Sequence, residues 1–600
     1  MAASFTCTVL LLLFHSAAGN ASVSTPLGVI NGVTERVAFQ ENTYEVDKYL
    51  GIPFAKAPLG ELRFKKPLPY GTFSEPYNAT EDPPACPQYD SYNLGKPLGK
   101  RSEDCLFLNV YVPRHKPDEK SGHAVMVFIH GGGYAVGAGH MFESEVFASV
   151  GNVITVTINY RLGLLGFMDL DDGTSAGNFG LWDQRLALQW VNENIESFGG
   201  VKDRVTVFGS SGGAVCTLLH MMYPPNKGLF RGAITQSGAL VVPTAFQKNN
   251  KETAKHYARY LGCRYENQDD IFHCLKSATP ENIIKVNSDV IAAGDMETAM
   301  KLIISPTIDG EYVKKHPTDL YKLAESEPQS EIEFFRSLKL INGINGAEGA
   351  LFIMMMGRPE DLDQLEITRE QINNHHIPGA ISQIYGADKK VPDSVKQLLI
   401  AEYTDWDSPD DPKRLREQVL RLNGDTYFNV PGIEMSRIHA NASNVDSYVY
   451  NFIPQLHKRS LPTPAWVKKA VHGDEIAPLF GYNFAIYKDK TDLPPQWEYD
   501  LSRRMITYWT NFAKSGDPNK PVRNASPSLI WPKYSITSQK YMILDKEDSV
   551  SQFLYAREFA FWRNTLPALF REAEHAQTLT SEYGNQVDES CEKDENCDGG

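Results

Sequence analysis

The chain has 600 residues, of which 42% are hydrophobic and 22% are charged. This composition can fill a large core and excludes an intrinsically disordered protein, which would be depleted in apolar residues. The formal net charge is −15, and the Lys and Arg residues are scattered along the chain. Binding to nucleic acid or to an anionic membrane surface needs clustered positive charge, so we expect neither.

The first nineteen residues have the pattern of a secretory signal peptide, residues 1–19. An apolar run at 9–14 is followed by small residues at 16–19, although no Lys or Arg precedes it. The alternative is a short buried helix. No other apolar run approaches the roughly 20 residues that span a bilayer. We therefore expect a secreted, soluble protein.

The cysteines and the glycosylation sequons fit export. Cys216 lies in an apolar stretch, so we expect a buried free thiol there. Two pairs of sequence neighbours could each close a short loop, Cys86 with Cys105 and Cys263 with Cys274. Sequons begin at Asn20, Asn78, Asn441 and Asn524. Cys591 and Cys597 lie in an acidic tail, residues 571–600, which we expect to be mobile, and they could pair locally or between chains.

Strand-like and helix-like segments alternate along the chain. Continuous apolar runs at 124–129 and 152–160 predict strands of a sheet that is covered on both faces. A helix is expected over 185–198, the end of a strand at 205–208 and another helix over 214–221. This order is typical of βαβ units. It predicts an α/β protein with a large, mostly parallel central sheet flanked by helices.

Two other segments lack such a pattern. Prolines within 43–64 predict a surface run rather than a helix. Residues 340–349 hold one acid, Glu348, among Asn and Gly residues and predict a loop.

The junction between the strand at 205–208 and the helix at 214–221 is Gly209-Ser210-Ser211-Gly212-Gly213. A Gly-x-Ser-x-Gly sequence that turns a strand into a helix is the nucleophile elbow of α/β-hydrolases, in which the serine is exposed. The motif predicts Ser211 as a nucleophile. Alone it is weak, because an ordinary glycine-rich turn could have the same sequence.

A serine hydroxyl needs further groups before it can act as a nucleophile. His130-Gly131-Gly132-Gly133 follows a strand, and its bare N–H groups suit an oxyanion hole, although a tight loop is the alternative. A base and an orienting acid are also required. Among fifteen histidines, His472 lies in a late glycine turn, and the order Ser211, Glu348, His472 is the order of α/β-hydrolase triads. Asp309 is an alternative acid.

These motifs resemble those of type-B carboxylesterases and cholinesterases, over roughly residues 25–566. Further motifs occur in the family's order: Gly51-Ile52-Pro53-Phe54, Glu103-Asp104-Cys105-Leu106-Phe107-Leu108-Asn109, Asn159-Tyr160-Arg161, Asp183-Gln184 and Ser515-Gly516-Asp517-Pro518. The resemblance implies an α/β-hydrolase fold in one catalytic domain, residues 20–570. It is closer to a secreted carboxylesterase than to a cholinesterase.

The resemblance also implies roles for individual residues. The catalytic triad would be Ser211, Glu348 and His472, and the oxyanion would be bound by the N–H groups of Gly132, Gly133 and Gly212. Disulfides would join Cys86 to Cys105 and Cys263 to Cys274, and ion pairs would join Arg63 to Glu103 and Arg161 to Asp183. Neutral carboxylic esters would be hydrolysed through an acyl-enzyme, with no metal or cofactor. The alternative is a catalytically silent adhesion or binding member of the family.

The sequence departs from cholinesterases at places that bear on the substrate. Between Cys86 and Cys105 it has Tyr89 and Tyr92 but no Trp to hold a quaternary ammonium, and Ser210 replaces the usual Glu. Choline esters are therefore not expected. Met300 and Leu302 align with the acyl pocket, and Leu351 and Phe352 follow Glu348, which predicts a medium or larger acyl group. Gly212 replaces a common Ala, and Phe559 replaces a disulfide cysteine. A small-molecule ester is the expected partner, and the oligomeric state stays open.

Overall fold

The computed structural model of the chain describes residues 19–89, 98–118, 120–170, 177–241, 245–246, 250–264, 266–292, 304–323, 326–357, 359–385, 391–441, 445–459, 461–482, 492–521, 529–573 and 575–576. Expectations that concern the signal peptide, Tyr92, Met300, Leu302, Asn524, Cys591, Cys597 and nearly all of the tail lie outside these residues.

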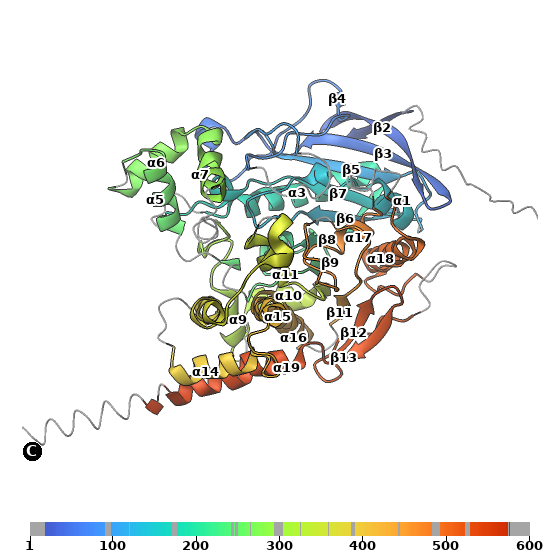
Figure 1. Cartoon of the computed structure of the whole chain (residues 1–600). Coiled ribbons are helices and arrows are strands. Elements are labelled where there is room, and N and C mark those ends of the chain that lie inside the picture. The colour runs from blue at the N-terminus through green and yellow to red at the C-terminus, as the bar shows by residue number, and fades with distance from the viewer. Residues whose placement is uncertain are drawn as a thin grey trace, which may run out of the picture.

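Thirteen strands in the described part of the chain form one mixed sheet. The strand order is β1-β2-β3-β5-β7-β6-β8-β9-β10-β11-β12-β13, with β4 beside β2. Strands from β7 across to β12 pair in parallel, whereas the pairs at both ends are antiparallel. The expected α/β architecture with a large central sheet is confirmed (Figure 1). The strands are β1 (Gly19–Thr25), β2 (Gly28–Phe39), β3 (Asn42–Pro53), β4 (Tyr77–Asn78), β5 (Phe107–Pro113), β6 (His123–Ile129), β7 (Ile154–Ile158), β8 (Gly200–Ser210), β9 (Gly232–Gln236), β10 (Lys339–Asn345), β11 (Ser447–Phe452), β12 (Lys540–Leu544) and β13 (Ser549–Gln552).

Helices cover both faces of this sheet. They are α1 (Glu145–Gly151), α2 (Gly163–Phe167), α3 (Phe179–Asn194), α4 (Gly212–Met221), α5 (Asn250–Tyr260), α6 (Gln268–Ser277), α7 (Pro280–Ala292), α9 (Pro317–Leu323), α10 (Ser330–Ser337), α11 (Ala350–Met355), α12 (Arg369–Gln371), α13 (Ile377–Tyr385), α14 (Asp393–Glu402), α15 (Pro412–Gly424), α16 (Val430–Ala440), α17 (Ile476–Leu479), α18 (Gln496–Ser515) and α19 (Ala556–Ala560).

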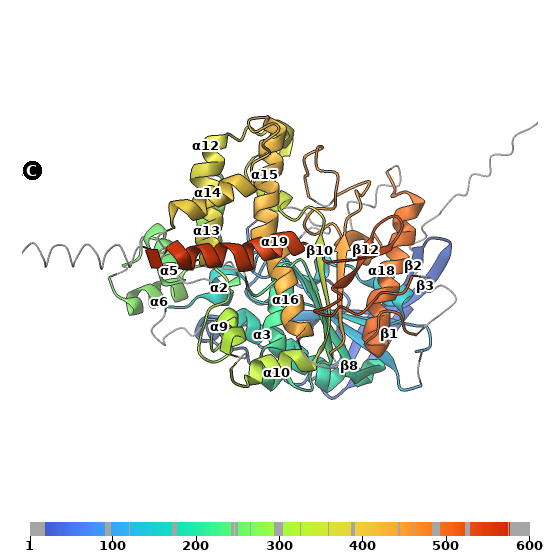
Figure 2. The ribbon, with the colours of Figure 1, turned by 90° about the horizontal axis from the view of Figure 1, so that it is seen from below.

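Alternate side chains of β6 enter two different cores, as the period of a strand requires. Val125 and Val127 pack in a cluster that includes residues of α3 and α4. Met126 and Phe128 pack in a second cluster with residues of α18. A third cluster joins α13, α14 and α15 to the helix that follows α19, and Figure 2 shows these helices gathered at one end of the molecule. The continuous apolar runs in the sequence therefore belong to strands that are covered on both faces.

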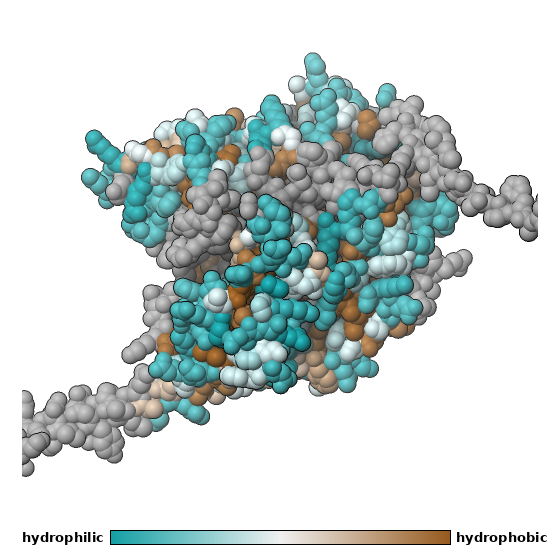
Figure 3. All heavy atoms as spheres, viewed as in Figure 1, coloured by the Kyte–Doolittle hydropathy of each residue, from teal (hydrophilic) through white to brown (hydrophobic). Residues whose placement is uncertain are grey.

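Figure 3 shows one face of the molecule coloured by hydropathy. Hydrophilic side chains cover much of the face in Figure 3, with apolar residues between them. Within the described ranges, no helix has the length and apolar content to cross a membrane.

The prediction that residues 43–64 are a surface run rather than a helix is correct for the absence of an α-helix and for the exposed residues 59–61, but it is wrong for the first half of the segment. Residues 42–53 form strand β3, and Ile52 and Phe54 are buried. Pro53 is the last residue of the strand, a position where its missing N–H interrupts little of the hydrogen-bond ladder. The family motif at 51–54 is therefore part of the core.

Residues 340–349 were predicted as a loop, but most of them form strand β10. This strand lies between β9 and β11, and all but its first residue are buried. Gly343 is required there, because a Cβ atom would lie 1.8 Å from Cζ of Tyr450 on β11. The loop begins only after Asn345, so Glu348 follows the carboxyl end of a parallel strand.

The covalent and ionic links fit the family pattern. Disulfides join Cys86 to Cys105 and Cys263 to Cys274, while Cys216 is a buried free thiol. Arg161 forms two side-chain hydrogen bonds with Asp183, at 2.8 and 2.7 Å, and Arg63 pairs with Glu103. Phe559 lies under the guanidinium of Arg437, with 4.8 Å between the Arg437 Cζ and the ring centroid.

Candidate active site

The nucleophile elbow joins the end of β8 directly to α4. Ser211 stands between them with φ 56° and ψ −127°, a backbone conformation that L-residues rarely adopt. Its N–H donates to the carbonyl of Gln236 at 2.8 Å, and its own carbonyl accepts from Ala214 N at 2.9 Å. Gly213 is needed for the sharp turn, because a Cβ there would lie 2.1 Å from the Ile129 carbonyl. The turn leaves the Ser211 side chain partly exposed.

The glycine loop after β6 lies against this elbow. A Cβ atom on Gly131 would lie 2.6 Å from the Ser210 carbonyl oxygen and 3.0 Å from Ser211 Cβ. A Cβ on Gly212 would lie 3.4 Å from the backbone nitrogen of Gly133. Gly132 and Gly133 have φ values of 101° and 59°, which favour glycine. The three predicted oxyanion donors therefore lie on neighbouring backbone segments beside Ser211.

His130 holds this glycine loop in place, a role that the sequence did not suggest. Its ring stacks on Tyr160, with 4.5 Å between ring centroids, and Tyr160 Oη donates to the His130 carbonyl at 2.9 Å. His130 Nδ1 lies 2.8 Å from the Gly131 carbonyl oxygen. Burial lowers the pKa of His130 to about 4, so the ring is neutral at pH 7.

The predicted acid and base form a buried pair. His472 Nδ1 lies 2.7 Å from Glu348 Oε2, and both side chains are almost fully buried. Glu348 Oε1 accepts from the Asn345 backbone N–H at 2.7 Å and from Ser237 Oγ at 2.5 Å. These bonds fix the carboxylate at the end of β10. Ser237 and Asn345 were missed in the sequence because neither belongs to a recognisable motif.

The carboxylates around His472 favour its charged form. Burial lowers the pKa of His472, but the charge and hydrogen bond of Glu348, with smaller effects of Glu475 and Asp474, raise it above its ordinary value. Asp309, the alternative acid, instead accepts backbone hydrogen bonds from Glu311 and Val313 in its own turn. The acid beside His472 is thus Glu348.

A second buried carboxylate, Glu475, joins the elbow to the histidine loop. Its Oε1 accepts from Ser210 Oγ at 3.3 Å and from Gln236 Nε2 at 3.2 Å, and its Oε2 accepts from Asn345 Nδ2 at 2.5 Å. Burial and then the charge of Glu348 raise the pKa of Glu475. In the described residues no hydrogen bond joins Ser211 Oγ to His472, and the Glu475 network is one of the links between their two segments. The only signal for Glu475 in the sequence was its position three residues after His472.

A group of aromatic rings lies beside His472. The ring of Phe428 lies 4.7 Å from the His472 ring, centroid to centroid. Phe352 contacts Tyr427 at 4.3 Å and Phe428 at 6.3 Å. Phe352 was predicted near the site, whereas Tyr427 and Phe428 lie on a helical segment that carried no motif. His472 thus has an aromatic neighbour, Phe428, in addition to the carboxylates around it.

No group of three or more His, Cys, Asp or Glu side chains within the described ranges could hold a metal ion. The candidate site consists of the elbow, the glycine loop and the Glu348–His472 pair.

Comparison with known proteins identifies the family of the chain. The sequence profile of the carboxylesterase family matches residues 19–562. The chain belongs to the carboxylesterase family. It is 33% identical to the pyrethroid hydrolase Ces2a of Mus musculus over 591 residues, which cover 96% of this chain and 97% of that protein. It is likewise 33% identical to the pyrethroid hydrolase Ces2e of Rattus norvegicus, covering 95% of this chain and 94% of that protein.

The similarity also extends to proteins whose names do not denote a hydrolase. This chain is 32% identical to neuroligin-3 of Mus musculus over 601 residues, which cover 92% of the chain and 69% of the neuroligin. Family membership establishes the α/β-hydrolase fold for this carboxylesterase relative, and the chemistry depends on the residues of its site.

Proposed function

We propose that this protein is a serine carboxylic-ester hydrolase that works through an acyl-enzyme intermediate. The observation that carries the proposal is the buried Glu348–His472 pair, 2.7 Å apart, on a loop that Glu475 ties to the Ser211 elbow. A carboxylate at Nδ1 holds the imidazole in the tautomer whose Nε2 can accept a proton. Ser211 is the hydroxyl that the elbow presents to such a base.

In the proposed reaction, Ser211 Oγ attacks the ester carbonyl while His472 Nε2 takes its proton. The hydrogen bond from Ser211 to His472 forms when substrate binds, since catalytic hydrogen bonds are often long in an empty site. The N–H groups of Gly132, Gly133 and Gly212 stabilise the oxyanion. His472 then protonates the leaving alcohol and activates the water that releases the acid, while Glu348 stabilises the imidazolium.

The preferred substrate is a neutral ester with a medium or larger acyl group. The aromatic group of Phe352, Tyr427 and Phe428, which contacts His472 through Phe428, supports this preference. Ser210 stands where cholinesterases have a Glu, and no Trp lies between Cys86 and Cys105 to bind a quaternary ammonium. A series of p-nitrophenyl esters of increasing acyl length should therefore peak beyond acetyl. A peak at acetyl, or a preference for choline esters, would contradict this specificity.

The site of action proposed is outside the cell. Residues 1–19 would be removed as a signal peptide, leaving the catalytic domain 20–570 and the acidic tail 571–600. Three of the sequon asparagines, Asn20, Asn78 and Asn441, lie in the described part of the chain and are exposed, as glycosylation requires. A homo-oligomer is compatible with this proposal.

The experiment that tests the proposal is turnover of a p-nitrophenyl ester by the secreted protein. Ser211→Ala should lower kcat by about 10⁴-fold or more, whereas Ser210→Ala should keep most of the activity. Similarity to neuroligins supports the alternative, a silent adhesion or binding protein. Wild-type protein that is folded but turns over no ester would favour that alternative.

A further inference from the structure

The turn that carries His472 is bound by the side chain of Arg459, which comes from an earlier segment. Asp474 closes this turn, because its N–H donates to the Val471 carbonyl at 3.1 Å and its Oδ2 accepts from the Val471 N–H at 2.8 Å. Arg459 Nε lies 3.4 Å from the same Asp474 oxygen, and Arg459 Nη2 donates to the Lys469 carbonyl at 2.9 Å. The guanidinium therefore joins the residues on both sides of His472.

Arg459 is largely buried, whereas the two residues before it reach the surface. The side chains of Arg459 and Asp474 are 10% and 2% exposed. His457 and Lys458 instead pair with Asp492, at 2.7 and 3.2 Å, in an exposed group. A buried guanidinium is costly to desolvate, and only good partners offset that cost. The ion pair and the hydrogen bond to the histidine turn are the partners that Arg459 has.

The opposite side of the same turn contacts the segment before Glu348. Ala347 pairs with Val471 in a short parallel bridge, and Asn345 Nδ2 donates to the Val471 carbonyl at 2.8 Å. These contacts align the two segments that carry the acid and the base. The distance of 2.7 Å between His472 Nδ1 and Glu348 Oε2 therefore depends on how the turn is held from both sides.

Arg459 also acts on the charge of Asp474. Burial raises the pKa of Asp474 to about 7, and the charge of Arg459 is the main effect that opposes burial. The charge of Asp474 in turn raises the pKa of His472, after the larger effects of Glu348 and Glu475. Without Arg459, Asp474 would be mostly neutral at pH 7, and its effect on His472 would be lost.

We propose that Arg459 is a positioning residue for His472, acting through Asp474 and through the carbonyl of Lys469. This role depends on the proposed function, since His472 matters as the base of the reaction. Loss of a cation near an imidazole ordinarily raises the imidazole pKa, because a repulsion disappears. Loss of Arg459 should instead lower the pKa of His472, because Asp474 loses its charge.

The pKa of His472 can be measured from the ring C–H signal in the NMR spectrum of histidine-labelled protein, and His472→Gln identifies this signal by its loss. We expect Arg459→Gln and Asp474→Asn each to lower the pKa by about 0.5 or more. The acidic limb of the pH–rate profile should move with it. Arg459→Lys keeps the charge and should restore most of the wild-type pKa, although it loses the fork that reaches both partners. An unchanged or raised pKa in Arg459→Gln would overturn the proposal.

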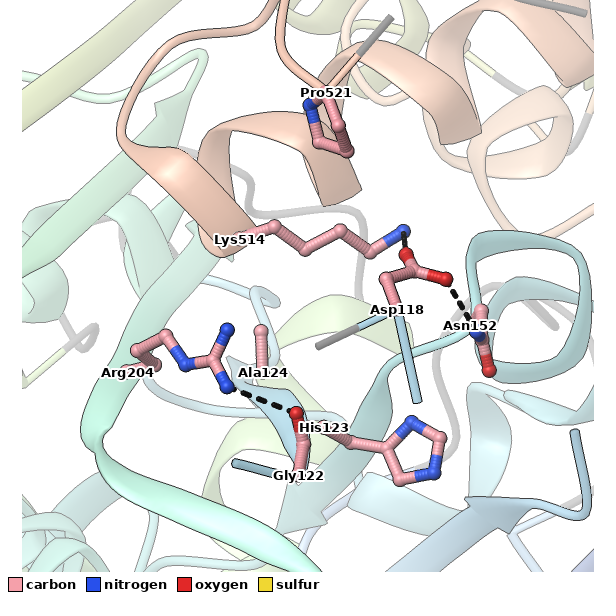
Figure 4. Close-up of a pocket in the computed structure, with 8 residues that line it drawn as sticks. All are labelled: Asp118, Gly122, His123, Ala124, Asn152, Arg204, Lys514 and Pro521. Atoms are coloured by element: carbon pink, nitrogen blue, oxygen red, sulfur yellow. Dashed lines mark hydrogen bonds and ion pairs between the residues drawn. The ribbon is translucent and has the colours of Figure 1, made fainter. Parts of the chain in front are cut away.

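Two controls separate this effect from a general loss of charge or stability. Lys468→Met removes an exposed cation from the same segment and should not lower the pKa of His472. Lys514→Gln breaks another buried ion pair, in which Lys514 lies 3.0 Å from Asp118 beside a cavity of about 210 Å³ (Figure 4). His123 lines that cavity and begins β6, whose other end leads to the glycine loop, so the pair is remote from His472. The pKa of His472 should therefore stay in place.

A double variant tests the route through Asp474. When Arg459→Gln is added to Asp474→Asn, the pKa of His472 should not fall further, and two additive decreases would overturn this route. Asp474→Asn keeps an oxygen for the Val471 N–H, so it remains a test if Arg459→Gln, which leaves a buried carboxylate unpaired, does not fold. An unchanged pKa in Asp474→Asn would also overturn the proposal.

The NMR signal of His472 does not require turnover, so the two proposals can fail separately. A wild-type protein that hydrolyses no ester, but in which the pKa of His472 falls in Arg459→Gln, would contradict the proposed function and support the positioning role. Normal ester turnover with the same pKa of His472 in wild type, Arg459→Gln and Asp474→Asn would contradict the positioning role alone.

Discussion

Ser210 Oγ donates a hydrogen bond of 3.3 Å to Glu475 Oε1, and this contact joins the residue before Ser211 to the loop that carries His472. Where other family members have a Glu before the serine, this chain has a short neutral donor. Glu475 therefore has three donors around it, from Ser210, Gln236 and Asn345, and no second carboxylate at position 210.

Glu475→Gln should destabilise the protein. All three of its partners donate, so the amide nitrogen of Gln would face a donor in a buried site, at a cost of about 1–3 kcal/mol in the free energy of unfolding. The same change removes a charge that raises the pKa of His472, so the acidic limb of the pH–rate profile should move to lower pH. Denaturant unfolding and the pH profile measure the two effects. Unchanged stability together with an unchanged profile would show that Glu475 does not act on this site.

Glu348→Gln should move the acidic limb of the pH–rate profile to lower pH by more than Glu475→Gln does. Activity needs neutral His472, so it rises with pH through the raised pKa of that residue. Without the carboxylate, burial dominates, the pKa falls, and the acidic limb moves to lower pH. The imidazolium also loses its stabilising charge, so kcat should fall by about 10³-fold or more. Asp309→Asn is the control, and kcat should stay within about twofold of wild type because Asp309 only closes a turn. An acidic limb that stays in place in Glu348→Gln would exclude Glu348 as the partner of His472.

A methyl group added beside Ser211 should be tolerated on Gly212 of the elbow and not on Gly131 of the glycine loop. On Gly212 it would meet Tyr134 Cε1 at 3.3 Å and Gly133 N at 3.4 Å, distances that a small shift relieves. Gly212→Ala should keep kcat within about fivefold. On Gly131 the methyl would lie 2.6 Å from the Ser210 carbonyl oxygen and push the loop from the elbow, so Gly131→Ala should lose about 10²-fold or more. Equal activity in the two variants would argue against an oxyanion hole in this loop.

Gly343→Ala should strongly destabilise the sheet. The new Cβ would lie 1.8 Å from the ring of Tyr450 on the neighbouring strand, and we expect a loss of about 3 kcal/mol or more in the free energy of unfolding. Gly379→Ala is the matched control, because a Cβ there meets no atom within 4 Å in helix α13. It should stabilise the protein by about 0.5–1 kcal/mol. Similar unfolding midpoints for the two variants would contradict the packing described for β10.

The sequence correctly predicted those elements whose local composition matches their burial in the structure. The apolar runs of β6 and β7 and the Gly-x-Ser-x-Gly junction belong to this class. Strand β10 was missed because Asn342, Gly343 and Asn345 have the composition of a loop. The reasons for these residues are tertiary: Asn342 bonds Thr235 and Ser436, and Gly343 makes room for Tyr450.

At the candidate site, too, residues in local motifs could be predicted, whereas residues placed by tertiary packing could not. Ser211, Glu348 and His472 could be proposed from motif order, since the family keeps these short sequences together. Glu475, Ser237 and Phe428 could not, because none of them belongs to such a motif and each reaches the site only through tertiary packing. Ser237 follows β9, whose carboxyl end lies beside those of β8 and β10, whereas Glu475 lies in the loop of His472 and Phe428 in the helical segment before α16.

The most direct test of ester hydrolysis is to trap the acyl-enzyme. The wild-type protein is mixed with a p-nitrophenyl ester, quenched in acid within milliseconds to seconds, and digested for mass spectrometry. The mechanism predicts a burst of p-nitrophenol and one added acyl group on the peptide that contains Ser211, with neither in Ser211→Ala and both in Ser210→Ala. Turnover of the ester without an acyl group on Ser211, or with the acyl group on Ser210, would contradict the proposed mechanism.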